Sequence, residues 1–319
     1  MKTYQPANKG NWQGRQSTSQ LYLHEKIQFG SIVDLKNSEG KNIAMLGYAC
    51  DAGVQRNQGR IGAVKGPEAL RKMLATLSNH FSQELNLWDL GDMICDSQDL
   101  EIIQEETARA IANLIKQEFF PLILGGGHDL AYAHFNGIRL AHPGAKIGII
   151  NLDAHFDLRP APIQGNSGTP FWQIAKNEKE FNLNYLCLGI QKESNNRELF
   201  EIAKENKVEY FLNTEFSIEH WPTIRKELNS FTSRVDFVYL TIDLDGFTSA
   251  LAPGVSAPSP LGFQWEIAYK TIAYICQTEK LISADIVELN PTYDQDNSTA
   301  RLASRIAYLI IEKIDAIQF

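Results

Sequence analysis

Cysteine is scarce in this chain of 319 residues, which contains Cys50, Cys95, Cys187 and Cys276. No two of them form a CxxC pair or lie near one another in the sequence. Isolated cysteines of this kind usually behave as small buried hydrophobic residues, and stable disulfides are rare in reducing compartments. We therefore expect four reduced thiols in a cytoplasmic protein.

Long apolar runs and positive charge are also lacking. No run reaches the roughly 18–20 apolar residues of a membrane-spanning helix, and the polar amino-terminal stretch has no apolar signal-peptide segment. The formal net charge is −8, whereas nucleic-acid-binding proteins present a basic face. The sequence predicts a cytoplasmic protein with neither a membrane nor a nucleic acid as partner. An anionic substrate would need local arginines to overcome the overall charge.

Short apolar runs alternate with helix-period segments through most of the chain. Runs without polar alternation are typical of strands buried on both faces of a parallel sheet, and we expect strands near 43–49, 121–126, 146–153, 185–190, 237–245 and 281–289. Helices are expected over 66–77 and 100–119, after His128, and at the carboxyl end. This alternation predicts a doubly wound α/β fold. Residues 1–40 are expected to form an irregular arm and 41–319 a single catalytic domain.

Reactive side chains follow the predicted strands at the points where they end, which is where ligands bind in such sheets. His128 comes after a strand and three glycines in GGGHD. Asp153, His155 and Asp157 follow the next strand in DAHFD. Their spacing would point all three to one face if the backbone stays extended. Two carboxylates and an imidazole on one buried face repel one another and lose hydration unless a cation joins them.

Three more carboxylates stand at two further strand ends. Asp243 and Asp245 lie at the end of the predicted strand 237–245, and Glu288 lies at the end of the predicted strand 281–289. The complete set of imidazoles and carboxylates is too large for one tetrahedral zinc ion. An oxygen-rich set with imidazole suits two divalent ions and favours manganese, and such a pair can hold a bridging hydroxide.

The motifs GGGHD, DAHFD, DLDGF…APGVSAPSPLG and VELNP together resemble those of the ureohydrolases, the family of arginase, agmatinase and formimidoylglutamase. The similarity extends from about residue 43 to the end of the chain. It implies a three-layer α/β/α sandwich around an eight-stranded, mostly parallel sheet, usually in a homo-oligomer. It also implies two Mn²⁺ ions per subunit, held by His128, Asp153, His155, Asp157, Asp243 and Asp245. Glu288 matches the family glutamate that binds the planar nitrogen group of the substrate.

Substrate choice depends on the segments that differ within this family. Arginase and agmatinase carry a histidine where this chain has Ser167, and a serine before GTPF is similar to formimidoylglutamase. N-formimidoyl-L-glutamate is a dicarboxylate, and arginine is the usual bidentate partner of a carboxylate. Asn166, Ser167 and three arginines are therefore predicted to bind substrate, with Arg159 on one carboxylate and Arg56 or Arg60 on the other.

We thus predict hydrolysis of the amidine C–N bond of N-formimidoyl-L-glutamate to glutamate and formamide, with Asp157 and Glu288 as catalytic residues. Three alternatives stay open: an agmatinase or guanidino-acid hydrolase releasing urea, a single-metal deacetylase on a related sheet, and a non-catalytic metal-binding relative. The remaining histidines carry no motif and are expected at the surface or in ordinary packing; they are His24, His80, His134, His142 and His220.

Overall fold

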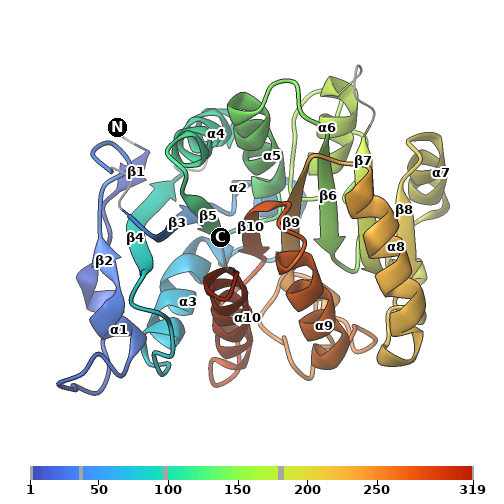
Figure 1. The fold of residues 1–319 in the computed structure, drawn as a ribbon. Coiled ribbons are helices and arrows are strands. Elements are labelled where there is room, and N and C mark those ends of the chain that lie inside the picture. Colours follow the sequence, from blue (N-terminus) through green and yellow to red (C-terminus); the bar gives the residue numbers. More distant parts are fainter. Residues whose placement is uncertain (1–2, 36–38, 96–99, 179–182, 318–319) are drawn as a thin grey trace.

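Eight parallel strands form the centre of the protein (Figure 1) in a computed structural model that describes residues 3–35, 39–95, 100–178 and 183–317. Their order across the sheet is β4-β3-β5-β10-β9-β6-β7-β8. The bounds are β3 Lys41–Ala49, β4 Leu85–Ile94, β5 Phe120–Leu124, β6 Ile147–Leu152, β7 Asn184–Ile190, β8 Glu209–Leu212, β9 Phe237–Asp243 and β10 Leu281–Val287. All seven pairings between them are parallel, which confirms the predicted sheet.

Two further strands of two residues each extend the sheet at β4. Tyr4–Gln5 (β1) pairs antiparallel with it and Gln28–Phe29 (β2) pairs parallel. A short helix, α1 (Leu23–Lys26), lies between them. The first part of the chain therefore covers one edge of the sheet with short regular elements (Figure 1).

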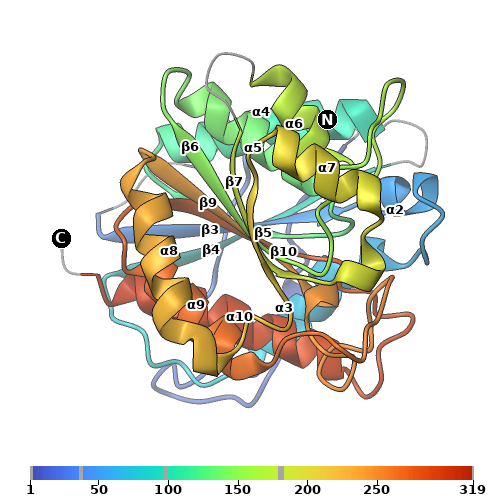
Figure 2. The same cartoon turned by 90° about the vertical axis from the view of Figure 1, so that its right-hand side faces the viewer.

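Helices cover both faces of the sheet and make the predicted three layers, as Figure 2 shows. One face carries α4 Leu100–Lys116, α5 Leu130–Ala141, α6 Pro170–Asn177 and α7 Arg197–Glu205. The opposite face carries α3 Gly66–Ala75, α8 Trp221–Ser233, α9 Trp265–Cys276 and α10 Ser298–Asp315. The short α2 (Ala52–Arg56) lies in the loop after β3.

The sheet separates two hydrophobic cores, and each strand contributes to both. In β6, Ile149 belongs to the core under α4 and α5, whereas Ile150 belongs to the core under α9 and α10. A strand buried on both faces needs apolar residues at successive positions. This is why the apolar runs of the sequence lack polar alternation.

The apolar pattern does not predict β4, because a charged residue interrupts it. Asp89 is fully buried in the middle of β4 and forms an ion pair at 2.9 Å with Arg71 of α3, which is only 1% exposed. A buried charge requires such a partner, but the pairing joins different elements and has no local signature.

Among the helices in the described ranges, none combines the length and the apolar character that a membrane-spanning helix needs.

Candidate metal centre

The candidate site lies at the carboxyl ends of β5, β10, β9 and β6, four strands that are neighbours in the sheet. The turn after β5 needs glycine there. A Cβ on Gly126 would lie 1.9 Å from the carbonyl oxygen of Cys50, and the amide of Gly127 donates to the same oxygen at 3.0 Å. This close approach of two backbones brings His128 under the end of the sheet.

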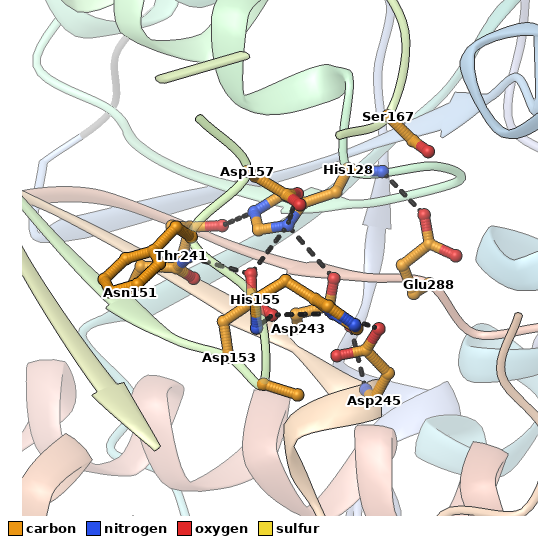
Figure 3. A network of polar contacts seen from close by, with 12 residues as sticks. His128, Asn151, Asp153, His155, Asp157, Ser167, Thr241, Asp243, Asp245 and Glu288 are labelled. Carbon is orange, nitrogen blue, oxygen red and sulfur yellow. Dashed lines mark hydrogen bonds and ion pairs between the residues drawn. The ribbon is translucent and has the colours of Figure 1, made fainter. Parts of the chain in front are cut away.

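Three carboxylates surround one nitrogen of His128 (Figure 3). Its Nδ1 lies 3.2 Å from Asp153 Oδ2, 3.0 Å from Asp157 Oδ2 and 3.0 Å from Asp243 Oδ2. His128 and Asp153 are at most 1% exposed. These four side chains offer ligand atoms close enough together to share one metal ion.

A second group with the same property adjoins the first. It consists of Asp153, His155 and Asp245, with His155 Nδ1 at 3.1 Å from Asp245 Oδ2 and 3.6 Å from Asp153 Oδ1. Asp153 belongs to both groups, so the structure brings together all six residues that the sequence singled out as ligands. Asp243 lies in the first group only.

The electrostatics of the cluster favour a bound cation. Burial would lower the pKa of His128, but the contacts with Asp153, Asp157 and Asp243 outweigh it and raise that pKa well above its usual value. Burial also raises the pKa of Asp243 well above its usual range, and the charges of Asp245 and Asp153 raise it further. The cluster thus holds positive charge tightly, and a divalent ion could take the place of the Nδ1 proton.

Two polar atoms at the edge of the cluster also favour a bound cation. Asp245 Oδ1 and Glu288 Oε2 are buried and have no hydrogen-bond partner among the described residues. A buried carboxylate oxygen without a partner is costly. A metal ion or a cationic substrate group would relieve that cost, so the donor set fits the manganese pair that the resemblance implies.

The ligands converge through local backbone turns, and the predicted strand-face alternation is wrong. β6 ends at Leu152, so Asp153 and the residues after it lie in a loop, and Asp157 has a left-handed φ of 47°. β9 ends at Asp243, and Asp245 follows in a 3₁₀ turn whose amide donates to Asp243 Oδ1 at 2.8 Å. Left-handed backbone is uncommon outside glycine, and here it turns the Asp157 carboxylate back toward His128.

Glu288 lies just past β10, also with a left-handed φ of 67°. Its Oε1 accepts a hydrogen bond of 2.9 Å from the amide of His128. Burial raises the pKa of Glu288 to about 8, and the charge of Asp245 contributes to the rise. The carboxyl is therefore poised to bind a cationic group, which would favour its charged form.

We expect this shifted pKa to appear in the stability of protein freed of metal with EDTA. The pKa of Glu288 rises from 4.5 to about 8 on folding, so its contribution to stability is full below pH 4.5 and is lost as the pH rises toward 8. The Glu288→Gln variant lacks this titration. Its free energy of unfolding relative to wild type, measured by urea denaturation, should increase between pH 5 and pH 8.5. A difference that stays constant over that range would contradict the shift.

The arginines predicted to bind substrate lie in two different places. Arg159 and Arg60 line a cavity of about 270 Å³ beside the cluster. Arg159 Nη1 donates to Asn57 Oδ1 at 2.8 Å, while Arg60 donates to the carbonyl of Ser256 at 2.9 Å and lies over the ring of Tyr293.

Arg56 does not line the cavity. It forms an ion pair with Glu101 and donates to the carbonyl oxygen of Gly165, which ties the loop after β3 to its surroundings. Ser167 lines the cavity, and Asn166 supports the loop by accepting a hydrogen bond of 2.9 Å from Gly168 N.

The structure adds two kinds of residue that the motifs did not single out. Asn57 and Ser256 also line the cavity, and Asn57 bridges Arg159 to Ser167, to whose Oγ it donates at 3.1 Å. Ser256 lies in the APGVSAPSPLG motif already noted for its similarity to the family, so its position was a usable signal. His134 is fully buried in a polar network, which corrects the expectation of a surface or packing histidine. Its partners are distant in sequence, so no local pattern could reveal them.

A sequence profile of the Arginase family matches residues 41–312. The chain belongs to the arginase family. It is 44% identical over 268 residues to the formimidoylglutamase of Chromobacterium violaceum, covering 83% of this chain and 86% of that protein.

Two crystal structures share the fold of this arginase-family chain. That of Bacillus subtilis formimidoylglutamase has a TM-score of 0.84 at 24% identity and covers 96% of this chain and 95% of that one. That of Trypanosoma cruzi formiminoglutamase with Mn²⁺ has a TM-score of 0.79 at 24% identity and covers 91% of this chain and 99% of that one. The predicted family and fold are confirmed.

Proposed function

We propose that this arginase-family hydrolase cleaves the amidine C–N bond of N-formimidoyl-L-glutamate, releasing formamide and glutamate. One observation carries the proposal: a single cavity joins the imidazole–carboxylate cluster and Glu288 to two arginines, Arg60 and Arg159. The cavity thus has an acidic end and a basic end, which match a molecule with a cationic amidinium and two carboxylates. The related formimidoylglutamase at 44% identity supports the same substrate.

The six cluster residues would hold two Mn²⁺ ions. His128, Asp153, Asp157 and Asp243 form one site, and Asp153, His155 and Asp245 form the core of the other. When bound, such a pair supplies an activated water as the nucleophile at neutral pH.

Glu288 orients the reacting group. Because Oε1 is held by the amide of His128, the unpartnered Oε2 is the atom that accepts an N–H of the amidinium. This hydrogen bond sets the plane of the amidine before attack, and positioning of that kind accounts for much of a rate enhancement. Asp157 Oδ2, beside the cluster and bordering the cavity, carries the proton to the leaving amine.

The arginines select the substrate at the other end of the cavity. Arginine presents several N–H groups in a plane, and those of Arg159 that do not bind Asn57 can pair with a carboxylate. Agmatine carries an ammonium group at the corresponding end, and two guanidinium groups would repel it. The cavity therefore favours a dicarboxylate over the agmatinase alternative.

A substrate panel on manganese-loaded protein tests the function. The substrates are N-formimidoyl-L-glutamate, agmatine, arginine and 4-guanidinobutyrate, and the products scored are formamide and urea. Formamide from the first substrate alone supports the proposal. Urea from any of the others would keep the hydrolytic site but overturn the substrate, and no product from any would favour a non-catalytic relative.

Two variants test whether Asp157 carries the proton by comparing its loss with the loss of the neighbouring Ser167 hydroxyl. Ser167→Ala removes a hydroxyl whose contact is one hydrogen bond from Asn57, so kcat should fall by no more than about 10-fold. Asp157→Asn changes a carboxylate 3.0 Å from His128 Nδ1, and kcat should fall by at least ~100-fold. Rates of formamide release measure both, and equal losses would contradict the role of Asp157.

A further inference from the structure

A chain of buried polar side chains continues from the cluster into the space between the sheet and α5. It consists of Thr241 and Tyr239 on β9, Asp285 and Ser283 on β10, and His134 on α5, all fully buried. Thr241 and Asp285 are direct partners in the pairing of β9 with β10. Burying a polar group is costly unless it forms hydrogen bonds. The donor and acceptor of each hydrogen bond in this series of side chains can therefore be assigned in turn.

The Thr241 hydroxyl connects the chain to the cluster. It donates its single proton to Asp285 Oδ1 at 2.6 Å. Its oxygen therefore acts as an acceptor toward His128 Nε2, 3.0 Å away (Figure 3). The ring of His128 must carry a proton on Nε2, which leaves Nδ1 as the atom that can meet a metal ion among the three carboxylates.

Asp285 is held in one orientation by two further donors. Its Oδ2 accepts from the Tyr239 hydroxyl and from His134 Nδ1, the latter at 2.6 Å. The second nitrogen of His134 donates to Ser283 Oγ, because that hydroxyl donates its own proton to the carbonyl of Pro121 at 2.8 Å. Both ring nitrogens of His134 therefore carry protons, and the ring pairs with the Asp285 carboxylate as an ion pair. With Oδ2 saturated by two donors, Oδ1 is the oxygen that faces Thr241.

We propose that Asp285 is a positioning residue which, acting through Thr241, keeps the proton of His128 on Nε2 and so presents Nδ1 to the metal. The inference rests on the proposed metal site. A metal ligand whose second nitrogen is held in this way loses only the Nδ1 proton on binding. Outer-shell partners of this kind typically change metal affinity by about 10–100-fold.

The Asp285→Asn variant should reverse the direction of the hydrogen bonds from Thr241 to Asp285 and from His128 to Thr241, a series called the relay below. The substitution hardly changes the shape of the side chain. As long as Tyr239 and His134 both donate toward the Oδ2 position, the new NH₂ group is disfavoured there. It therefore takes the place of Oδ1 and donates to Thr241, whose proton then turns toward His128 Nε2. The His128 ring is left with its proton on Nδ1, inside the metal site.

Two measurements test this expectation. Chelator-competition titration of Mn²⁺ should show an affinity about 10–100-fold below that of wild type. Long-range ¹H–¹⁵N spectra of metal-free, ¹⁵N-histidine-labelled protein should show Nε2 of His128 protonated in wild type and unprotonated in the variant, with the signal assigned from its loss in His128→Gln. Unchanged affinity, or Nε2 still protonated in the variant, would overturn the inference.

A matched pair at Thr241 keeps the test independent of how well Asp285→Asn folds. Thr241→Ser retains the hydroxyl and should bind Mn²⁺ like wild type, whereas the similarly sized Thr241→Val removes the acceptor and should bind about 10–100-fold more weakly. Equal affinities of the two variants would overturn the relay.

The spectra need neither metal nor substrate, so the two proposals fail separately. A wild-type enzyme that releases formamide but has Nε2 unprotonated refutes the relay alone. One with Nε2 protonated and Mn²⁺ bound, but without formamide release, supports the relay and refutes the substrate.

Discussion

The Asp243→Ala variant is expected to lose at least ~99% of the hydrolytic activity, because removal of one ligand from a paired metal site removes the chemistry that the pair supplies. Asp243 is 2% exposed, and its Oδ2 lies 3.0 Å from His128 Nδ1 within the four-residue group. Elemental analysis after dialysis should find less manganese per chain than in wild type. Retention of both ions by an inactive variant would contradict the assignment of Asp243 as a ligand.

The same variant should fold normally without metal. Burial raises the pKa of the Asp243 carboxyl well above its usual range, so in EDTA this group opposes folding at neutral pH and its removal should not lower the melting temperature. Added Mn²⁺ should stabilise wild type, by about 2.7 kcal/mol at 100 times the Kd, and the variant much less. Asp236→Ala is the matched control, since Asp236 is exposed and precedes the opposite end of β9. This control should keep both metal and activity.

The Arg159→Met variant should lower kcat/KM for N-formimidoyl-L-glutamate by about 100-fold, chiefly through KM, which corresponds to ~2.7 kcal/mol for charge-assisted hydrogen bonds from an exposed arginine. Arg159 lines the cavity beside the cluster, and Asn57 holds its guanidinium in place. Methionine keeps much of the side-chain volume but cannot bind a carboxylate. Steady-state kinetics of formamide release measure the effect.

Arg56→Met is the matched control for this substitution. The sequence also predicted Arg56 to bind a substrate carboxylate, yet it pairs with Glu101, whose side chain is 57% exposed, and lies outside the cavity lining. Its kcat/KM should stay within about 3-fold of wild type, since surface ion pairs contribute little. N-propylformamidine, which has no carboxylate, should be hydrolysed at equal rates by wild type and Arg159→Met. A loss with that substrate would mean that Arg159 supports the site rather than the substrate.

Much of the site could be predicted because its chemistry lies in residue types at strand ends. Six candidate ligands were identifiable from three short segments, and all six converge in the structure. The geometry by which they converge was wrong, because Asp157 and Asp245 leave the extended conformation. Short-range spacing indicates side-chain direction only while the backbone keeps one regular conformation.

The sequence by itself determined the fold class, the family and the side chains that converge at the candidate site. Successive apolar residues require burial on both faces of a strand, and carboxylates that follow such strands require a cation. Only the tertiary structure decided that β5, β10, β9 and β6 are neighbours, that Arg56 turns to Glu101 while Arg159 enters the cavity, and that His134 lies beneath the cluster. The reason is physical: these outcomes depend on contacts between residues far apart in the chain, such as Thr241 and His128, 113 positions apart, and no local pattern encodes which distant group will satisfy a buried side chain.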